Sequence, residues 1–108
     1  MTTFNDREAA FENLYAHDEE MRFRLLARRN RLLGTWAAER MGLTPVEGEA
    51  YAKDVVRADF EESGDEDVIR KVLGDLTNAG VATDEAQIRA MLDTKAGEAR
   101  RQLIDAAS

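Results

Sequence analysis

Apolar residues recur at the spacing of an α-helix in four segments of this chain, and each of the first three ends at residues that stop helices. In residues 19–41 the apolar positions fall on one stripe and its immediate neighbours. Helix stops follow at Gly42, at Ser63–Gly64 and at Ala79–Gly80. Alanine, glutamate, arginine and leucine are abundant, and β-branched residues are sparse. The sequence therefore predicts an all-α fold, a four-helix bundle with short connections.

Start signals refine the limits of these helices. Thr44, Pro45 and Glu47 have the spacing of a capping box, so a second helix is expected from there to about Glu61. The third is expected to begin in the acidic run 65–67, and the fourth is expected to be capped by Thr83. The expected core comprises Met21, Leu25, Leu26, Leu32, Leu33, Trp36, Ala37, Ala52, Val55, Val56, Phe60, Val68, Ile69, Val72, Leu73, Leu76, Ile88, Met91, Leu92, Ala99 and Leu103.

The first 18 residues contain few apolar side chains. Phe4, Phe11, Leu14 and Tyr15 would share one side of a helix, but they bury too little to order that helix alone. We therefore divide the chain into a mobile N-terminal segment, residues 1–18, and a four-helix domain, residues 19–108. Two interpretations of the segment stay open, because its apolar residues can bind a groove on a partner or pack back onto the domain.

Charge is arranged in blocks along the chain. The total is −7, but residues 1–20 carry −5, residues 21–42 carry +5 and residues 43–67 carry −7. The negative total disfavours nucleic acid and anionic membranes as partners. The arginine-rich block leaves one phosphate-bearing partner open, a nucleotide, because guanidinium groups bind phosphate in a bidentate manner.

Several kinds of chemistry are disfavoured by the residues present. There is no cysteine for a thiolate site, and the glycines are dispersed rather than gathered in a phosphate-binding loop. The acids at 61, 62 and 65–67 lack the spacing of a calcium-binding loop. The chain starts with polar residues and has no apolar run of about 18 residues, so we expect an intracellular protein without a membrane span. We expect neither catalytic residues, nor a metal, nor a cofactor.

His17 is the one histidine, and it stands directly before Asp18, Glu19 and Glu20. No basic or nucleophilic partner accompanies it in sequence, so a surface histidine is the simplest interpretation. The alternative is a pH sensor whose protonation changes how far the first long helix extends toward the N-terminus.

Several strings in the sequence resemble the zeta subunit of alphaproteobacterial F-type ATP synthases. They are "AHDEEMRFRLLARRN" from Ala16, "GTWAAE" from Gly34, "AYAKDVV" from Ala50 and "DFEESGDEDV" from Asp59. The resemblance covers nearly the whole chain. It implies a four-helix bundle preceded by a mobile segment that inhibits ATP hydrolysis. In the family this segment enters the catalytic head at an interface of its alpha, beta and gamma subunits, orders into a helix and blocks rotation.

Carried onto this chain, the resemblance implies an inhibitory stretch from Thr2 to about His17. The candidate partner-binding residues are Thr2, Phe4, Asp6, Arg7, Glu8, Phe11, Leu14, Tyr15 and His17. Leu14 stands where we expect a basic residue in the strongest inhibitors, which predicts weaker inhibition here. The implied location is cytoplasmic, peripheral to the inner membrane through the ATP synthase.

The resemblance also implies an alternative function, because some family members bind ATP or ADP through the bundle. In that case inhibition would be weak or absent. The candidate nucleotide-binding residues are Arg22, Arg24, Arg28, Arg29 and Arg31.

Overall fold

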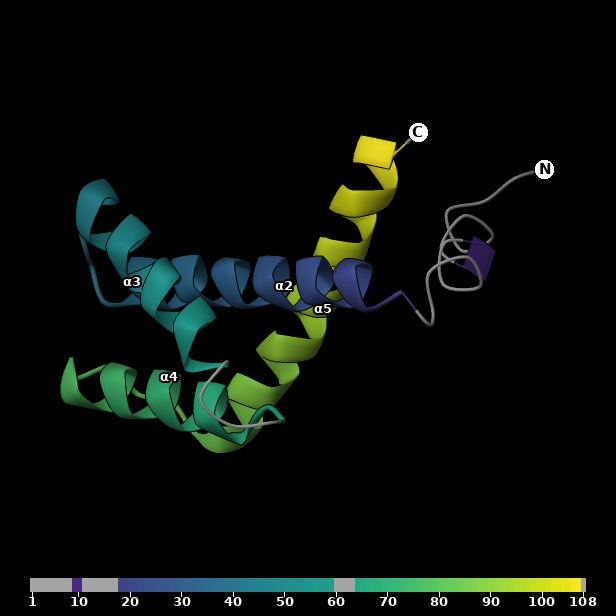
Figure 1. The fold of residues 1–108 in the computed structure, drawn as a ribbon. Coiled ribbons are helices and arrows are strands. Elements are labelled where there is room, and N and C mark those ends of the chain that lie inside the picture. The colour runs from purple at the N-terminus through teal and green to yellow at the C-terminus, as the bar shows by residue number, and fades with distance from the viewer. Residues whose placement is uncertain (1–8, 11–17, 60–63, 108) are drawn as a thin grey trace.

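The computed structural model describes residues 9–10, 18–59 and 64–107. Over these ranges the chain forms four helices longer than one turn and no strand (Figure 1). They are α2 (Glu19–Arg40), α3 (Pro45–Ala58), α4 (Glu66–Asn78) and α5 (Glu85–Ala107). The predicted all-α, four-helix fold is confirmed. Most of the predicted mobile segment lies outside the described residues.

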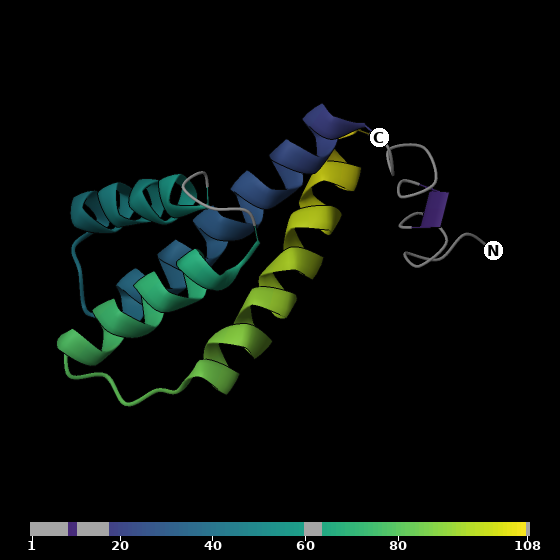
Figure 2. The same ribbon diagram turned by 60° about the horizontal axis from the view of Figure 1, so that its bottom comes forward.

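The first long helix, α2, is the centre of the fold, because it contacts each of the other three. α3 packs against it most extensively, and α5 crosses its first half (Figure 1). In Figure 2, α5 runs in the opposite direction to α2, α3 lies on the other side of α2 from α5, and α4 passes in front of the second half of α2. This arrangement leaves one face of α2 flanked by α3 and α5.

One apolar core joins the four helices. Its buried members are Leu33, Ala37, Val55, Val68, Ile69, Val72, Leu76, Ile88 and Leu92, and all of them belong to the predicted set. Leu26 was also predicted to be buried, but 39% of it is exposed. Five residues outside the expected core are also buried, namely Arg29, Asn30, Ala38, Ala58 and Ile104. Phe60 lies outside the described residues.

The turn after α2 follows the predicted stop and start signals. Gly42 has a φ of 72°, a left-handed conformation that favours glycine, and the Leu43 amide donates to the Ala38 carbonyl at 3.0 Å. The capping box of α3 is formed in both directions. The Glu47 amide donates to the Thr44 hydroxyl at 3.2 Å, and the Thr44 amide donates to the Glu47 carboxylate at 2.9 Å.

Two helix limits differ from the prediction. α5 is capped by Asp84 and not by Thr83, because the Asp84 carboxylate accepts from the Gln87 amide at 2.8 Å. Asp84 directly precedes the first helical residue, so its carboxylate reaches the Gln87 amide. The Thr83 hydroxyl instead donates to the side-chain oxygen of Gln87. α3 ends at Ala58 and not near Glu61, with Asp59 as its C-cap.

The start of α2 is closed by a side chain. Asp18 has an extended backbone, with a ψ of 106°, and its carboxylate accepts from the Met21 amide at 3.1 Å. This contact satisfies one of the amides that a helix start leaves without an intrahelical acceptor. The bundle therefore begins with its own N-cap.

Candidate functional site

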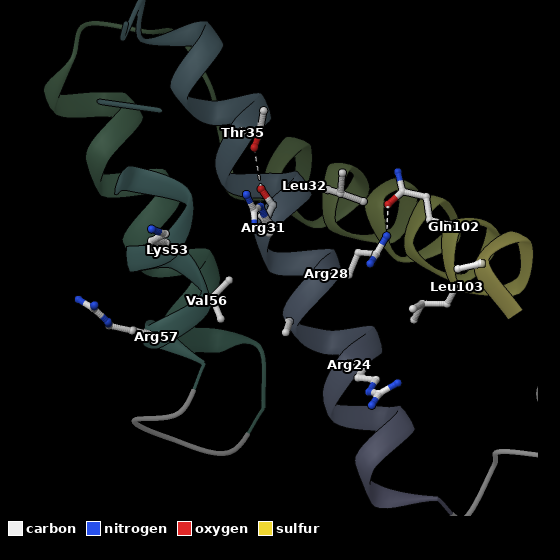
Figure 3. Close-up of a pocket in the computed structure, with 12 residues that line it drawn as sticks. Arg24, Arg28, Arg31, Leu32, Thr35, Lys53, Val56, Arg57, Gln102 and Leu103 are labelled. Atoms are coloured by element: carbon white, nitrogen blue, oxygen red, sulfur yellow. Dashed lines mark hydrogen bonds between the residues drawn. The ribbon is translucent and has the colours of Figure 1, made fainter. Parts of the chain in front are cut away.

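A groove with a volume of about 940 Å³ lies over α2, between α3 and α5 (Figure 3). Its apolar lining comes from Ala27, Leu32, Val56, Leu103 and Ala106. Its cationic lining comes from Arg24, Arg28, Arg31, Lys53 and Arg57. The residues include members of three helices, so the groove exists only in the folded chain.

Helical spacing places the three arginines of α2 along the groove. Arg24, Arg28 and Arg31 are separated by four and three residues, which puts them on one face. Arg24 pairs with Glu20 at 2.8 Å, and Arg31 pairs with Glu49. These carboxylates offset part of the positive charge at the two ends of the row.

Arg28, in the middle of the row, has a different kind of partner. Its guanidinium donates to the side-chain oxygen of Gln102 at 3.1 Å, which is a neutral amide (Figure 3). Across the groove, Lys53 forms no ion pair with any residue in the described part of the chain. Arg57 points away from α2 in Figure 3, and its guanidinium lies 3.6 Å from the Asp54 carboxylate. The positive charge of the groove is therefore least offset at Arg28 and Lys53.

The other two candidate arginines do not line this groove. Arg22 is exposed elsewhere on α2. Arg29 is buried, and its guanidinium lies 2.9 Å from a carboxylate oxygen of Asp65 and 4.0 Å from one of Asp59. Its Nε also donates to the Asn30 side chain at 3.1 Å. Arg29 therefore joins α2 to the end of α3 and the start of α4.

Burial raises the pKa of Asp59 above its ordinary value, and this effect outweighs the opposing attraction of Arg29. The cluster of Arg29, Asp59 and Asp65 thus contains a carboxylate that is costly to keep charged. We interpret it as a structural contact of the bundle, because it lies at a junction of three helices rather than in the groove.

Three of the five candidate arginines named from the sequence line the groove, and the sequence analysis missed Lys53 and Arg57. These two lie more than twenty residues from Arg31 in sequence, and helical periodicity within α3 marks them only as exposed positions. The candidate partner-binding residues from Thr2 to His17 all lie outside the described residues, so neither interpretation of His17, a surface histidine or a pH sensor, is tested.

A family model described as ATPase inhibitor subunit zeta matches residues 1–102. The chain belongs to this family. The match confirms the resemblance seen in the sequence, and it includes residues 1–17 together with nearly all of the helical bundle. The family is one of regulatory subunits and not of catalytic enzymes, so this zeta-family protein is an inhibitory regulatory subunit.

One solved structure is similar to this chain over most of its length. A protein determined by solution NMR is 49% identical to the zeta-family chain, with a TM-score of 0.70. The alignment covers 79% of this chain and 96% of that one. No curated protein matches the sequence.

Each acidic side chain at the start of α4, in residues 65–67, forms an ion pair with an arginine in this zeta-family protein. Asp65 contacts Arg29, Glu66 binds Arg89 at 2.8 Å, and Asp67 binds Arg70 at 3.1 Å. Over residues 9–10, 18–59 and 64–107, no group of three or more acidic or histidine side chains is placed to hold a metal ion. Within the same ranges, no helix is both long enough and apolar enough to cross a membrane.

Proposed function

We propose that this zeta-family protein inhibits ATP hydrolysis by inserting residues 2–17 into the catalytic head of the F-type ATP synthase. The insertion site is an interface of the alpha, beta and gamma subunits, and the protein acts in the cytoplasm, peripheral to the inner membrane. The observation that carries the proposal is the family match, which begins at residue 1 and so includes the segment.

The composition of the segment supports this mechanism. Phe4, Phe11, Leu14 and Tyr15 are too few to stabilise a helix in water, but a partner groove can bury them and offset the entropy of ordering the chain. Recognition of an amphipathic helix in a groove uses anchors at such spacings. Asp6, Arg7, Glu8 and Glu12 then set the orientation of the helix.

ATP hydrolysis by the cognate catalytic head tests the proposal. We expect the full chain to lower hydrolysis and the double variant Phe11→Ala/Tyr15→Ala to lose most of that effect. Val46→Ala is the matched control, because Val46 is an 81% exposed apolar residue at the start of α3. Hydrolysis that is unchanged by the full chain would contradict inhibition. Full inhibition by the double variant would contradict the role of the segment.

The cationic groove favours a second function, binding of ATP or ADP. Arg28 and Lys53 face one groove from two helices, and the groove also has apolar lining for a base. Arginine and lysine are the usual ligands of phosphate groups. A nucleotide bound in the groove would contact α2, α3 and α5 at once. Its affinity would therefore depend on how these three helices pack.

Amide chemical shifts during titration with ATP or ADP test the second function. We expect shifts in residues that line the groove, and their loss in the double variant Arg28→Ala/Lys53→Ala. Arg22→Ala is the matched control, because it removes an exposed arginine from the same helix outside the groove. Unshifted spectra at millimolar nucleotide would eliminate this function.

A further inference from the structure

Among the described residues that line the groove, every ionisable side chain is a cation. They are Arg24, Arg28, Arg31, Lys53 and Arg57. The other lining residues are apolar or carry an amide or a hydroxyl group. The cations belong to two helices, α2 and α3 (Figure 3). A ligand that enters the groove therefore meets positive charge from both helices and no carboxylate among these residues.

Three carboxylates beside the groove are each paired with one of its arginines. The pairs are Arg24 with Glu20, Arg31 with Glu49 and Arg57 with Asp54. A metal ion bound by any of these carboxylates would also lie close to a guanidinium group, which would repel it. The groove is therefore suited to an anion that arrives without a metal ion.

A phosphate group can bind at Arg28 without breaking an ion pair. The Arg28 guanidinium donates to the neutral amide oxygen of Gln102 at 3.1 Å. A charged phosphate oxygen accepts stronger hydrogen bonds from a guanidinium than an amide oxygen does. Lys53, on α3, forms no ion pair within the described part of the chain, so its ammonium group is available to the same phosphate chain.

Sites that hold a nucleotide together with Mg²⁺ have a different composition. Such sites usually bind the metal through one or two protein carboxylates and through the phosphate oxygens. In kinases and ATPases the metal bridges the β- and γ-phosphates and neutralises part of their charge. In this groove, arginine and lysine side chains would neutralise the phosphates instead. A bound Mg²⁺ would therefore take up the oxygens and cancel the charge that these side chains require.

Resting on the second proposed function, we propose that the groove selects the metal-free form of ATP or ADP. Phosphate oxygens bind Arg28 and Lys53, and the apolar lining contacts the base. Mg²⁺ competes with the protein for the same oxygens, so occupancy of the groove falls as Mg²⁺ rises at constant total nucleotide. The groove thus responds to a form of the nucleotide that a magnesium-dependent catalytic site does not use.

Titration of the full chain with ATP tests this selection by amide chemical shifts, once with EDTA and once with MgCl₂ in excess over the nucleotide. Ionic strength is kept constant with NaCl, because screening alone weakens contacts between exposed charges. We expect the dissociation constant to be about tenfold higher with Mg²⁺, since the metal removes part of the phosphate charge. A series with ADP is expected to change in the same direction.

The variant Gln102→Glu places a carboxylate beside Arg28 with little change in size. We expect it to weaken metal-free binding about tenfold, because the new carboxylate pairs with Arg28. The effect of Mg²⁺ should also become smaller, because the variant supplies a ligand for the metal. Gln87→Glu is the matched control, since it makes the same change at an exposed position of α5 outside the groove.

Equal or tighter binding with Mg²⁺ would overturn the selection while leaving nucleotide binding in place. Absence of shifts with either form of the nucleotide would instead overturn the second proposed function, and the selection with it. Equal effects of Gln102→Glu and Gln87→Glu would show that the phosphate does not bind beside Arg28, which also contradicts the proposal.

Discussion

Gly34 of α2 and Ala52 of α3 lie in backbone contact. A Cβ atom on Gly34 would be 2.8 Å from the Cα atom of Ala52 and 3.2 Å from a methyl group of Val55. The absence of a side chain at residue 34 therefore sets how closely α2 and α3 approach. The same approach positions Lys53 and Val56 of α3 at the edge of the groove.

Gly34→Ala is predicted to lower the free energy of unfolding by about 1–3 kcal/mol, because the added methyl group forces the two helices apart. Gly74→Ala in α4 is the control, since a Cβ there would meet nothing within 4 Å. That control is expected to stabilise by about 0.4–1 kcal/mol by reducing the freedom of the unfolded chain. Denaturant unfolding measures both, and equal stability of the two variants would contradict the close contact.

Arg29→Ala is predicted to lower the free energy of unfolding by about 3 kcal/mol, because it leaves the carboxylates of Asp59 and Asp65 without their buried cation. Arg24→Ala removes an exposed pair with Glu20 and is expected to change stability by no more than about 0.5 kcal/mol. Thermal or denaturant unfolding of the two variants gives the comparison. If the two variants lose similar free energies of unfolding, the Arg29 cluster stabilises the fold no more than an exposed ion pair does.

Asp59 is predicted to make stability depend on acidity. Because burial raises its pKa in the folded state, the folded protein holds this proton to a higher pH than the unfolded chain. Its contribution to stability is therefore full below the unfolded pKa, near 4, and is lost as pH rises through the folded pKa. Unfolding of Asp59→Asn at several pH values checks this, since the variant should gain stability relative to the wild type as pH rises. A difference that is independent of pH would contradict the prediction.

Tyr51 is predicted to ionise well above the ordinary range for tyrosine. Burial raises the pKa of its hydroxyl, and so does its hydrogen bond of 2.9 Å to the Asp75 carboxylate. Lys71 also binds Asp75, at 3.1 Å, and lies over the Tyr51 ring. In Tyr15→Phe, which leaves Tyr51 as the one tyrosine, ultraviolet absorbance should show no tyrosinate near pH 10.

The matched stability test for this contact is Tyr51→Phe, which should cost about 1 kcal/mol through loss of the hydrogen bond. Ionisation of Tyr51 near pH 10, or a neutral effect of the substitution, would show that the hydroxyl does not hold Asp75.

Local signals in the sequence predicted the helices and most of the core. The capping box at Thr44 and the apolar positions of α4 depend on residues only a few places apart, so spacing alone reveals them. Leu26 shows the limit of this reasoning. Its spacing is that of a core residue, but its burial depends on how far α3 and α4 extend along α2.

The groove could be predicted only in part for a similar reason. Periodicity places Arg24, Arg28 and Arg31 on one face, but it does not show that Lys53 and Gln102 lie beside them. Nor does it distinguish Arg29, whose burial follows from ion pairs with residues about thirty places away. Charge alone cannot separate an arginine that binds a ligand from one that stabilises the fold.

The side-chain cap at Asp18 makes the leading segment exchangeable. Because the Asp18 carboxylate satisfies the Met21 amide, residue 18 itself supplies the N-cap of α2. A chimaera that joins a different leader to residue 18 should therefore retain the same bundle. Different N-terminal segments, each suited to a different target enzyme, can then be joined to the same four-helix domain.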